Sequence, residues 1–501
     1  MKKRDHKILT QDKKKLAKRL KRKNYADQPG PMFQPANLHY QMSERTRGIG
    51  FGGIGAVHTL VTRLGLDEAI NREVPLLKAH VPYFESDHVL NIAYNVLTGG
   101  TCLEDIDRLR DDASYAEGLS AERIPDPTTA GDFLRRFQQR DIERLQEVFN
   151  QARRKVWAQQ PKSFFRKGIL DVDGTLAETA GECKQGMDIS YTGIWGYAPL
   201  MVSLANTKEP LYLVNRPGNQ TSSTGAAIWI DRAIKLASDF EELWLRGDTD
   251  FSLTEHLDKW DQKKVRFVLG YDAYPNLVAR AQQIVPAAWQ SLERPARYEV
   301  QTEPRQRPDN VKEAIIRERE YKNIRLKSEQ VAEFSYQPGK CGKAYRMVVV
   351  RKNLSVEKGE QVLFDDIRYF FYITNDGQMS AAEVVFFGND RCDQENVIEQ
   401  LKNGVNALRM PSDDLLSNWA YMVIAALGWN LKSWYGLMVP DQGAGQTIVR
   451  MEFKRFLHSF ILIPCQILKT GRRLVFRVLT YTRHLRTFFE TLDILKRVRF
   501  G

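Results

Sequence analysis

Residues 169–175 have the sequence ILDVDGT, an apolar run that ends in two carboxylates. Side chains alternate between the two faces of a strand, so Asp171 and Asp173 share one face while Leu170 and Val172 share the other. The period of the apolar residues is helical before residue 160 and becomes that of β-strands from Phe164 onward. This stretch therefore begins a sheet whose first strand carries two acids.

Short β-rich segments and helices follow this strand. The segments 196–206 (GYAPLMVSLAN) and 209–219 (EPLYLVNRPGN) predict two further strands, which we expect to be antiparallel to the first. A helix over 222–238 then leads to the strand 242–248 (ELWLRGD), and the alternation continues to about residue 285. Alternating strands and helices are typical of the α/β class.

Changes of pattern predict six parts. They are a basic, poorly ordered arm (1–45), an all-helical domain (46–160), the first part of an α/β core (161–285), a β-rich insertion (286–387), the second part of the core (388–440) and a basic C-terminal helical segment (441–501). Because the amphipathic helices of the helical domain carry clusters of Arg, such as Arg135 with Arg136, we expect this domain to bind DNA. Pro125 and Pro127 interrupt the helical domain, and the insertion is rich in Arg and Lys.

Charge and cysteine content restrict the class of protein. The formal net charge is +12, and basic residues gather within 13–23 and 472–486. A polyanion is the partner that this charge favours, although solvated basic tails would give the same pattern. The five cysteines form no CxxC pair, so the sequence indicates neither a disulfide framework nor a thiolate zinc site. No signal peptide pattern is present at residues 1–24, and we expect a soluble cytoplasmic protein.

Carboxylates recur where predicted strands end. Asp173 closes the first strand, and Asp248 closes a later strand of the same sheet, with Asp250 two residues further on. Carboxylate oxygens that converge from separate strands suit a hard cation such as Mg²⁺. Each acid taken singly could instead cap a helix or lie in a turn.

A third acid lies on the helix that starts near residue 391. At about 100° per residue, Arg391, Glu395 and Lys402 fall within about 40° of arc, beside an apolar face formed by residues such as Val397 and Leu401. A carboxylate flanked by two cations could complete a metal site, while the two cations bind phosphates. An exposed, salt-bridged helix face would show the same spacing.

These features together resemble a known family, the DDE transposases of bacterial insertion sequences that carry a Tyr-x2-Arg-x3-Glu-x6-Lys signature. The resemblance is carried by Asp173 with Thr175, by Asp248 in RGDTDF, by the spacing Arg391-x3-Glu395-x6-Lys402, and by GYAPLMV followed by LVNRPGNQTSSTGA. One position departs from the signature, because Gly388 stands where the family has Tyr.

The resemblance implies an RNase H-like catalytic core with a β-rich insertion between the second and third acids. The interval from Asp173 to Asp248 is 75 residues (248 − 173), whereas that from Asp248 to Glu395 is 147 (395 − 248), which agrees with an insertion there. It also implies that these three acids are catalytic and bind two Mg²⁺ or Mn²⁺ ions. Arg391 and Lys402 would contact DNA phosphates, and Asp171 would be a supporting acid.

The implied substrate is double-stranded DNA, namely the terminal inverted repeats and the target, held by a dimer in the synaptic complex. Two alternatives remain at this point. The segment DVDGT also resembles the first motif of haloacid dehalogenase-like phosphohydrolases, in which Asp171 would be the nucleophile. The second alternative is a DNA-binding protein that no longer catalyses.

Overall fold

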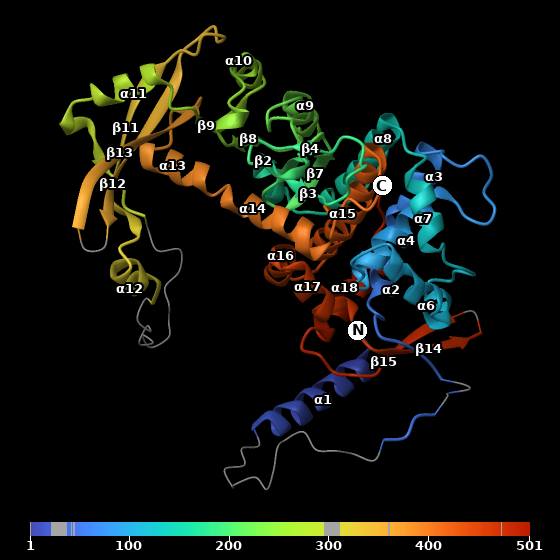
Figure 1. Ribbon diagram of the computed structural model, residues 1–501. Helices are drawn as coiled ribbons and strands as arrows, with labels where there is room; N and C mark the ends of the chain where they lie inside the picture. Colours follow the sequence, from blue (N-terminus) through green and yellow to red (C-terminus); the bar gives the residue numbers. More distant parts are fainter. Residues whose placement is uncertain are drawn as a thin grey trace.

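The fold was analysed in a computed structural model that describes residues 2–21, 38–41, 43, 46–294, 311–358, 361–471 and 473–500. Helix α1 (Lys3–Lys21) lies at one edge of the molecule, beside the C-terminal helix α18 (Leu485–Arg497), as Figure 1 shows. Part of the predicted basic arm is thus a regular helix, whereas its residues 22–37 lie outside the described part of the chain. None of the described helices is long and apolar enough to cross a lipid bilayer.

The core is a mixed sheet built from five strands. They are β2 (Lys167–Gly174), β6 (Leu200–Leu204), β7 (Glu209–Val214), β8 (Glu242–Gly247) and β9 (Val265–Tyr271). Their spatial order is β7-β6-β2-β8-β9. The β2–β6 and β6–β7 pairs are antiparallel, and β2–β8 and β8–β9 are parallel. The α/β prediction is confirmed, and the order is that of an RNase H-like core.

Helices cover this sheet at several points. α9 (Ala226–Leu236) packs on β2, β6 and β7, α10 (Thr254–Gln262) packs on β9, and α11 (Pro275–Gln282) follows β9. A small sheet of order β3-β5-β4 lies between β2 and β6 in the chain, formed by β3 (Ala177–Glu178), β4 (Asp188–Ile189) and β5 (Trp195–Tyr197).

The predicted insertion is β-rich, but it is not a separate sheet. Its strands are β10 (Gln290–Ser291), β11 (Lys322–Tyr336), β12 (Tyr345–Lys358) and β13 (Gln361–Thr374), with α12 (Val311–Glu318) before β11. β13 pairs antiparallel with β9 through Phe371–Thr374, so the core sheet continues into the insertion as nine strands. The chain then returns through α13 (Ala381–Asn389), so the boundary predicted at 387 falls inside a helix.

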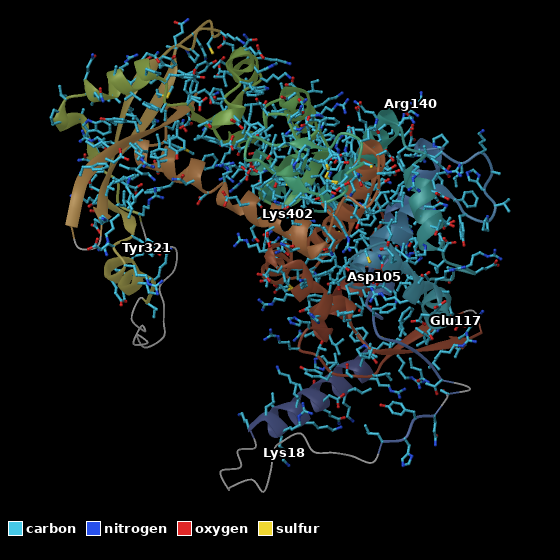
Figure 2. The ribbon with its side chains drawn as sticks, viewed as in Figure 1. Lys18, Asp105, Glu117, Arg140, Tyr321 and Lys402 are labelled. Atoms are coloured by element: carbon cyan, nitrogen blue, oxygen red, sulfur yellow. The ribbon has the colours of Figure 1, made fainter. Side chains whose placement is uncertain are left out.

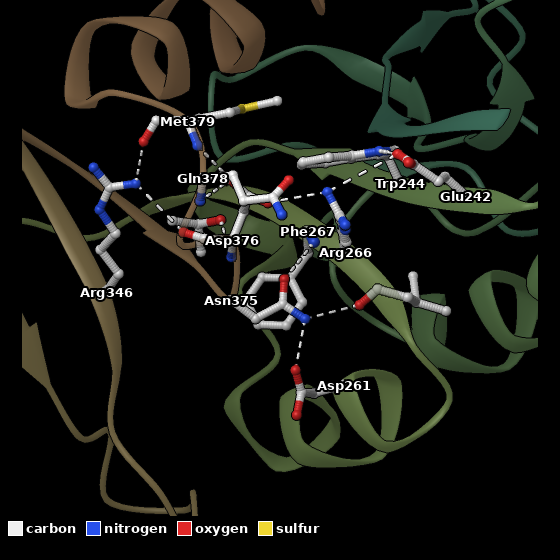
Figure 3. A network of polar contacts seen from close by, with 12 residues as sticks. Glu242, Trp244, Asp261, Arg266, Phe267, Arg346, Asn375, Asp376, Gln378 and Met379 are labelled. Atoms are coloured by element: carbon white, nitrogen blue, oxygen red, sulfur yellow. Dashed lines mark hydrogen bonds and ion pairs between the residues drawn. The ribbon is translucent and has the colours of Figure 1, made fainter. Parts of the chain in front are cut away.

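A polar corner fixes the turn between β13 and α13 (Figure 3). The carboxylate of Asp376 is buried; it accepts hydrogen bonds from the backbone of Gln378 and Met379 and pairs with Arg266 of β9 at 3.2 Å. Asn375 accepts from the backbone N–H of Phe267 at 2.9 Å and donates to the carbonyl of Val265. These contacts tie the exit from the insertion to β9, and thereby set the direction in which α13 leaves the sheet.

The part of the chain before the core is mostly helical, and its helices are packed against the rest of the chain. Its helices are α2 (Ile54–Leu64), α3 (Leu66–Glu73), α4 (Glu85–Leu97), α5 (Asp107–Arg110), α6 (Ala113–Gly118), α7 (Pro127–Leu134) and α8 (Gln139–Trp157). The long helix α15 (Leu415–Leu437) contacts α4, α7, α8 and β7, and it is buried from Ser417 to its end. Because α15 is shared by both regions, the helical domain and the core form one packed body.

The C-terminal segment predicted to be helical contains a β-hairpin, so that prediction is wrong in part. After α16 (Gln442–Arg450) and α17 (Phe453–Phe456), strands β14 (Cys465–Thr470) and β15 (Arg473–Val478) pair antiparallel. β14 also pairs with β1 (Arg47–Ile49), so the sheet joins the C-terminal segment to the start of the helical domain. Gly471, at φ +54°, makes the tight turn that separates the two strands.

One buried ion pair joins the helical domain to the core. Glu209 of β7 has no exposed side-chain surface; it accepts from Arg153 of α8 at 2.8 Å, from Trp434 of α15 at 2.6 Å and from Trp157 at 3.1 Å. Removal of residues 1–160 would take away Arg153 and Trp157 together with the helices that cover α15. A folded core without the helical domain is therefore not expected.

We expect Glu209→Gln to lower the free energy of unfolding by about 3–5 kcal/mol, because the buried Arg153 guanidinium would lose its counter-charge. The measurement is the midpoint of the unfolding transition in guanidinium chloride, followed by tryptophan fluorescence. Glu241→Gln removes the same charge from an exposed residue close by and serves as the control. Equal midpoints for the two variants would show that this ion pair does not join the two regions.

Candidate active site

Asp173 and Asp248 lie side by side at the carboxyl ends of two parallel strands. In the β2–β8 register Asp171 is opposite Arg246. Asp173 follows Asp171 by two residues, and Asp248 follows Arg246 by two residues. Asp173 is the last residue but one of β2, whereas Asp248 comes directly after β8 and accepts a hydrogen bond from the backbone N–H of Asp250. Both strands point the same way, so the sheet itself brings the two predicted acids together.

Arg391 bridges these two carboxylates. Its Nη1 atom lies 3.2 Å from Oδ2 of Asp173 and 3.5 Å from Oδ2 of Asp248. Its side chain is one-fifth exposed, and that of Asp173 still less. One guanidinium therefore offsets part of the negative charge of two neighbouring carboxylates.

Burial and like charge both disfavour ionisation of these acids. Burial is the largest cause that raises the pKa of Asp173, to about 7; the charges of Asp248 and Glu395 raise it further, and Arg391 opposes them. Burial likewise raises the pKa of Asp248, with smaller contributions from Asp250 and Asp272. The site thus concentrates more negative charge than Arg391 neutralises, which is a common property of functional sites.

The third acid, Glu395, lies on a helix close to the two strand ends. α14 (Cys392–Glu399) begins directly after Arg391, and Glu395 is close enough to Asp173 to raise its pKa. The helix does not continue regularly, because residues Gln400–Gly404 form a π-helical turn that contains Lys402. A π turn advances less than 100° per residue, so Lys402 does not keep the angle predicted for it. Among the described residues, none forms an ion pair with Lys402.

Asp171 does not join this group, although it shares a strand face with Asp173. Its carboxylate is buried and forms two hydrogen bonds with Arg246, at 2.7 and 2.8 Å. Arg246 also donates to the carbonyl of Phe387 in α13, and Gln394 of α14 donates to the backbone carbonyl of Asp171. These residues therefore hold α13 and α14 against β2 and β8, beside the acids.

Sequence reasoning did not identify Arg246, Gln394 or Asp272. Asp272 directly follows β9, the next parallel strand after β8, and its charge raises the pKa of Asp248. The signal was present in the sequence, since VRFVLGYD ends in an acid just as ELWLRGD does. Arg246 and Gln394 gave no such signal, because their roles depend on which strand and helix become neighbours.

The structure gives a steric reason for the glycine at the signature tyrosine position. A Cβ atom at Gly388 would lie 2.9 Å from Cε1 of Tyr372 and 3.3 Å from a methyl group of Val268. Tyr372 comes from β13, and its hydroxyl lies 3.0 Å from the side-chain oxygen of Asn389. A ring from the insertion thus occupies the space that a side chain at position 388 would need.

The donor chemistry at this end of the sheet fits a divalent cation. Asp173, Asp248 and Glu395 offer only carboxylate oxygens, the ligands that Mg²⁺ prefers. A cation held there would offset the same crowding of negative charge that Arg391 offsets in this structure. Among the described residues, no three metal-ligating side chains are already gathered closely enough to hold an ion. The side chains would have to close in around it.

The strand order and the acidic end of the sheet define an RNase H-like catalytic core. Residues 51–500 match the family described as transposase DDE domain group 1. The chain therefore belongs to the DDE transposase family. A comparison with curated proteins gave no match.

Among solved structures, the chain is similar to the piggyBac transposase in a cryo-EM structure of its synaptic complex with hairpin DNA. The sequence identity is 12%, the alignment covers 83% of each chain and the TM-score is 0.37. Family membership rests on the family match and not on this structural likeness.

We expect Arg246→Met to lower the free energy of unfolding by about 3–5 kcal/mol, because it leaves the Asp171 carboxylate buried without a counter-charge. Adding Asp171→Asn should recover much of that loss, since the uncompensated charge is then removed. Thermal denaturation of the wild type, both single variants and the double variant measures this coupling. Additive effects of the two substitutions would contradict the pairing.

Proposed function

We propose that this protein is an active transposase that binds the ends of its own mobile element and catalyses DNA strand cleavage and strand transfer. Asp173, Asp248 and Glu395 would be the acidic triad. The observation that carries the proposal is the Arg391 bridge between two carboxylates on neighbouring parallel strands, with Glu395 one helical turn away. This geometry joins Asp173, Asp248 and the Arg391-x3-Glu395 spacing, which are parts of the resemblance to the family.

The triad would hold Mg²⁺ or Mn²⁺, two ions when DNA is bound, and such ions activate the attacking oxygen and stabilise the leaving oxygen at a phosphodiester. The remaining roles belong to residues of the chain itself. Arg391 is a planar donor that can bind a phosphate oxygen as well as a carboxylate, and Lys402 lies further along the same helical segment. Asp171, Arg246 and Gln394 would act as positioning residues that keep α14 beside the sheet.

The geometry argues against the phosphohydrolase, whereas an inactive transposase would share it. Asp171 cannot be the nucleophile of a phosphohydrolase in this fold, because Arg246 holds both of its oxygens in the interior. A transposase that has lost catalysis keeps the same fold, and only an assay separates it from an active enzyme. All three acids are present, which favours activity. The DNA substrate, a dimeric synaptic complex and a cytoplasmic location are parts of the same proposal.

Glu395→Gln should abolish cleavage while DNA binding is retained, because one metal ligand is lost with little change in shape. The assay follows nicked products from a duplex that carries the ends flanking the reading frame, with Mg²⁺ or Mn²⁺ present, and measures binding of the same duplex by gel shift. Glu399→Gln lies one turn further along α14 and should cleave like the wild type. Wild-type cleavage by Glu395→Gln would remove Glu395 from the triad, and no cleavage by the wild type would favour the inactive form.

A further inference from the structure

A wide groove lies between the helical domain and the C-terminal hairpin, away from the acidic triad. Its volume is about 1060 Å³. One wall comes from α6 and its flanking loops, and the other from the turn and strands of β14 and β15. Figure 1 shows α6 beside these two strands. Glu117, labelled in Figure 2, lies on the α6 wall. The two walls are more than 300 residues apart in the sequence.

Close packing holds these walls in place. The ring of Phe476 in β15 lies against two helical glycines: a Cβ atom at Gly118 would be 3.1 Å from it, and one at Gly55 would be 3.2 Å from it. The pairing of β1 with β14 also fixes the hairpin to the start of the helical domain. The groove is therefore a built feature of the fold and not a space between loose segments.

Positive charge lines both walls of the groove. Its basic residues are Arg47, Arg110, Arg123, Lys469 and Arg473. Arg47 pairs with Glu117, whereas the other four are exposed and form no ion pair with any described residue. Tyr83 also lines the groove. Burial raises the pKa of its hydroxyl, and the positive charges of Arg123 and Arg110 oppose this rise. Four cations without an ion-pair partner among the described residues thus line one groove, together with the acids Asp111 and Glu122.

The chemistry of the groove differs from that of an ordinary small-molecule site. Such pockets are mostly apolar and carry few polar groups. Here charged side chains line an open groove. Three alanines also line the groove, namely Ala113, Ala116 and Ala121. Because their side chains are small, a broad ligand can approach the backbone there.

We propose that this groove binds the phosphate backbone of double-stranded DNA, at a site distinct from the acidic triad. The proposal rests on the proposed function, because it takes DNA as the substrate. Duplex DNA presents one phosphate charge per about 1.7 Å of its axis, so cations on two facing walls can each meet a phosphate. Phosphate contacts of this kind set the position of a protein on DNA without reading its sequence. The helical domain would then bind DNA only together with the C-terminal hairpin.

The first test replaces Arg110, Arg123, Lys469 and Arg473 together by Gln. Binding of a fluorescein-labelled duplex of random sequence is measured by anisotropy as a function of NaCl concentration. If each cation meets one phosphate, the slope of log affinity against log salt should fall by up to about 3.6, that is about 0.9 for each lost contact, and the affinity should drop at least about tenfold. A matched variant removes four exposed cations elsewhere, Arg140, Arg144, Lys235 and Lys264, and should change both quantities less.

A second test leaves every cation in place. Ala113→Glu adds a carboxylate to the groove wall, whereas Ala113→Gln adds a side chain of equal size without charge. Ala113 is exposed and is the first residue of α6, where Glu is well tolerated. Ala113→Glu should weaken DNA binding several-fold, and Ala113→Gln should not.

The results separate the two proposals. If the wild type binds and nicks DNA, while the groove variants bind it with unchanged affinity and salt slope, the groove proposal is wrong and the proposed function stands. An equal loss in the matched variant would also overturn it, since net charge alone would then explain binding. If the groove variants lose duplex binding and the wild type binds DNA but does not nick it, the groove proposal is supported and the proposed catalytic function is wrong. Equal displacement of the duplex by single-stranded DNA or heparin at the same charge concentration would contradict a duplex-shaped site.

Discussion

Two carboxylates on adjacent parallel strands repel each other, and a fold that places them there must supply positive charge at the same point. In this protein Arg391 supplies it, with one nitrogen 3.2 Å from Asp173 and 3.5 Å from Asp248. This contact joins the residue before α14 to the ends of β2 and β8. It therefore also brings Glu395 toward the sheet, because Glu395 is one turn further along the helix. The site assembles only if the sheet and this helix meet.

Much of the remaining structure keeps that helix in place. The buried pair of Asp171 and Arg246 reaches the carbonyl of Phe387, and Gln394 binds the backbone of β2. The long strands between the second and third acids continue the core sheet through β13, and the corner at Asp376 then directs α13 back toward the acids. The insertion thus continues the core sheet, and the chain leaves it through α13 on the side of the acids.

The sequence predicted features that depend on local pattern. Alternation in ILDVDGT and the strand-ending acid in ELWLRGD predicted Asp173 and Asp248 at strand ends of one sheet, and in the structure Arg391 contacts both carboxylates. Features that depend on distant neighbours escaped prediction. Asp171 and Asp173 share a strand face by periodicity, yet Arg246 on the adjacent strand binds only the first. The C-terminal hairpin was missed because its strands are stabilised by Phe476 packing on Gly55 and Gly118, far away in the chain. The angle of Lys402 was wrong because a π turn is not visible in a periodic pattern.

The central claim is that the two strand-end carboxylates form a divalent cation site. A crystal structure of the protein grown with Mn²⁺, with the ion located by anomalous scattering, tests it most directly. The account predicts an anomalous peak in contact with the carboxylates of both Asp173 and Asp248, and its loss in a crystal of Asp173→Asn. Crystals at saturating Mn²⁺ with no peak at these residues, and with Arg391 still within ion-pair distance of both, would contradict the account.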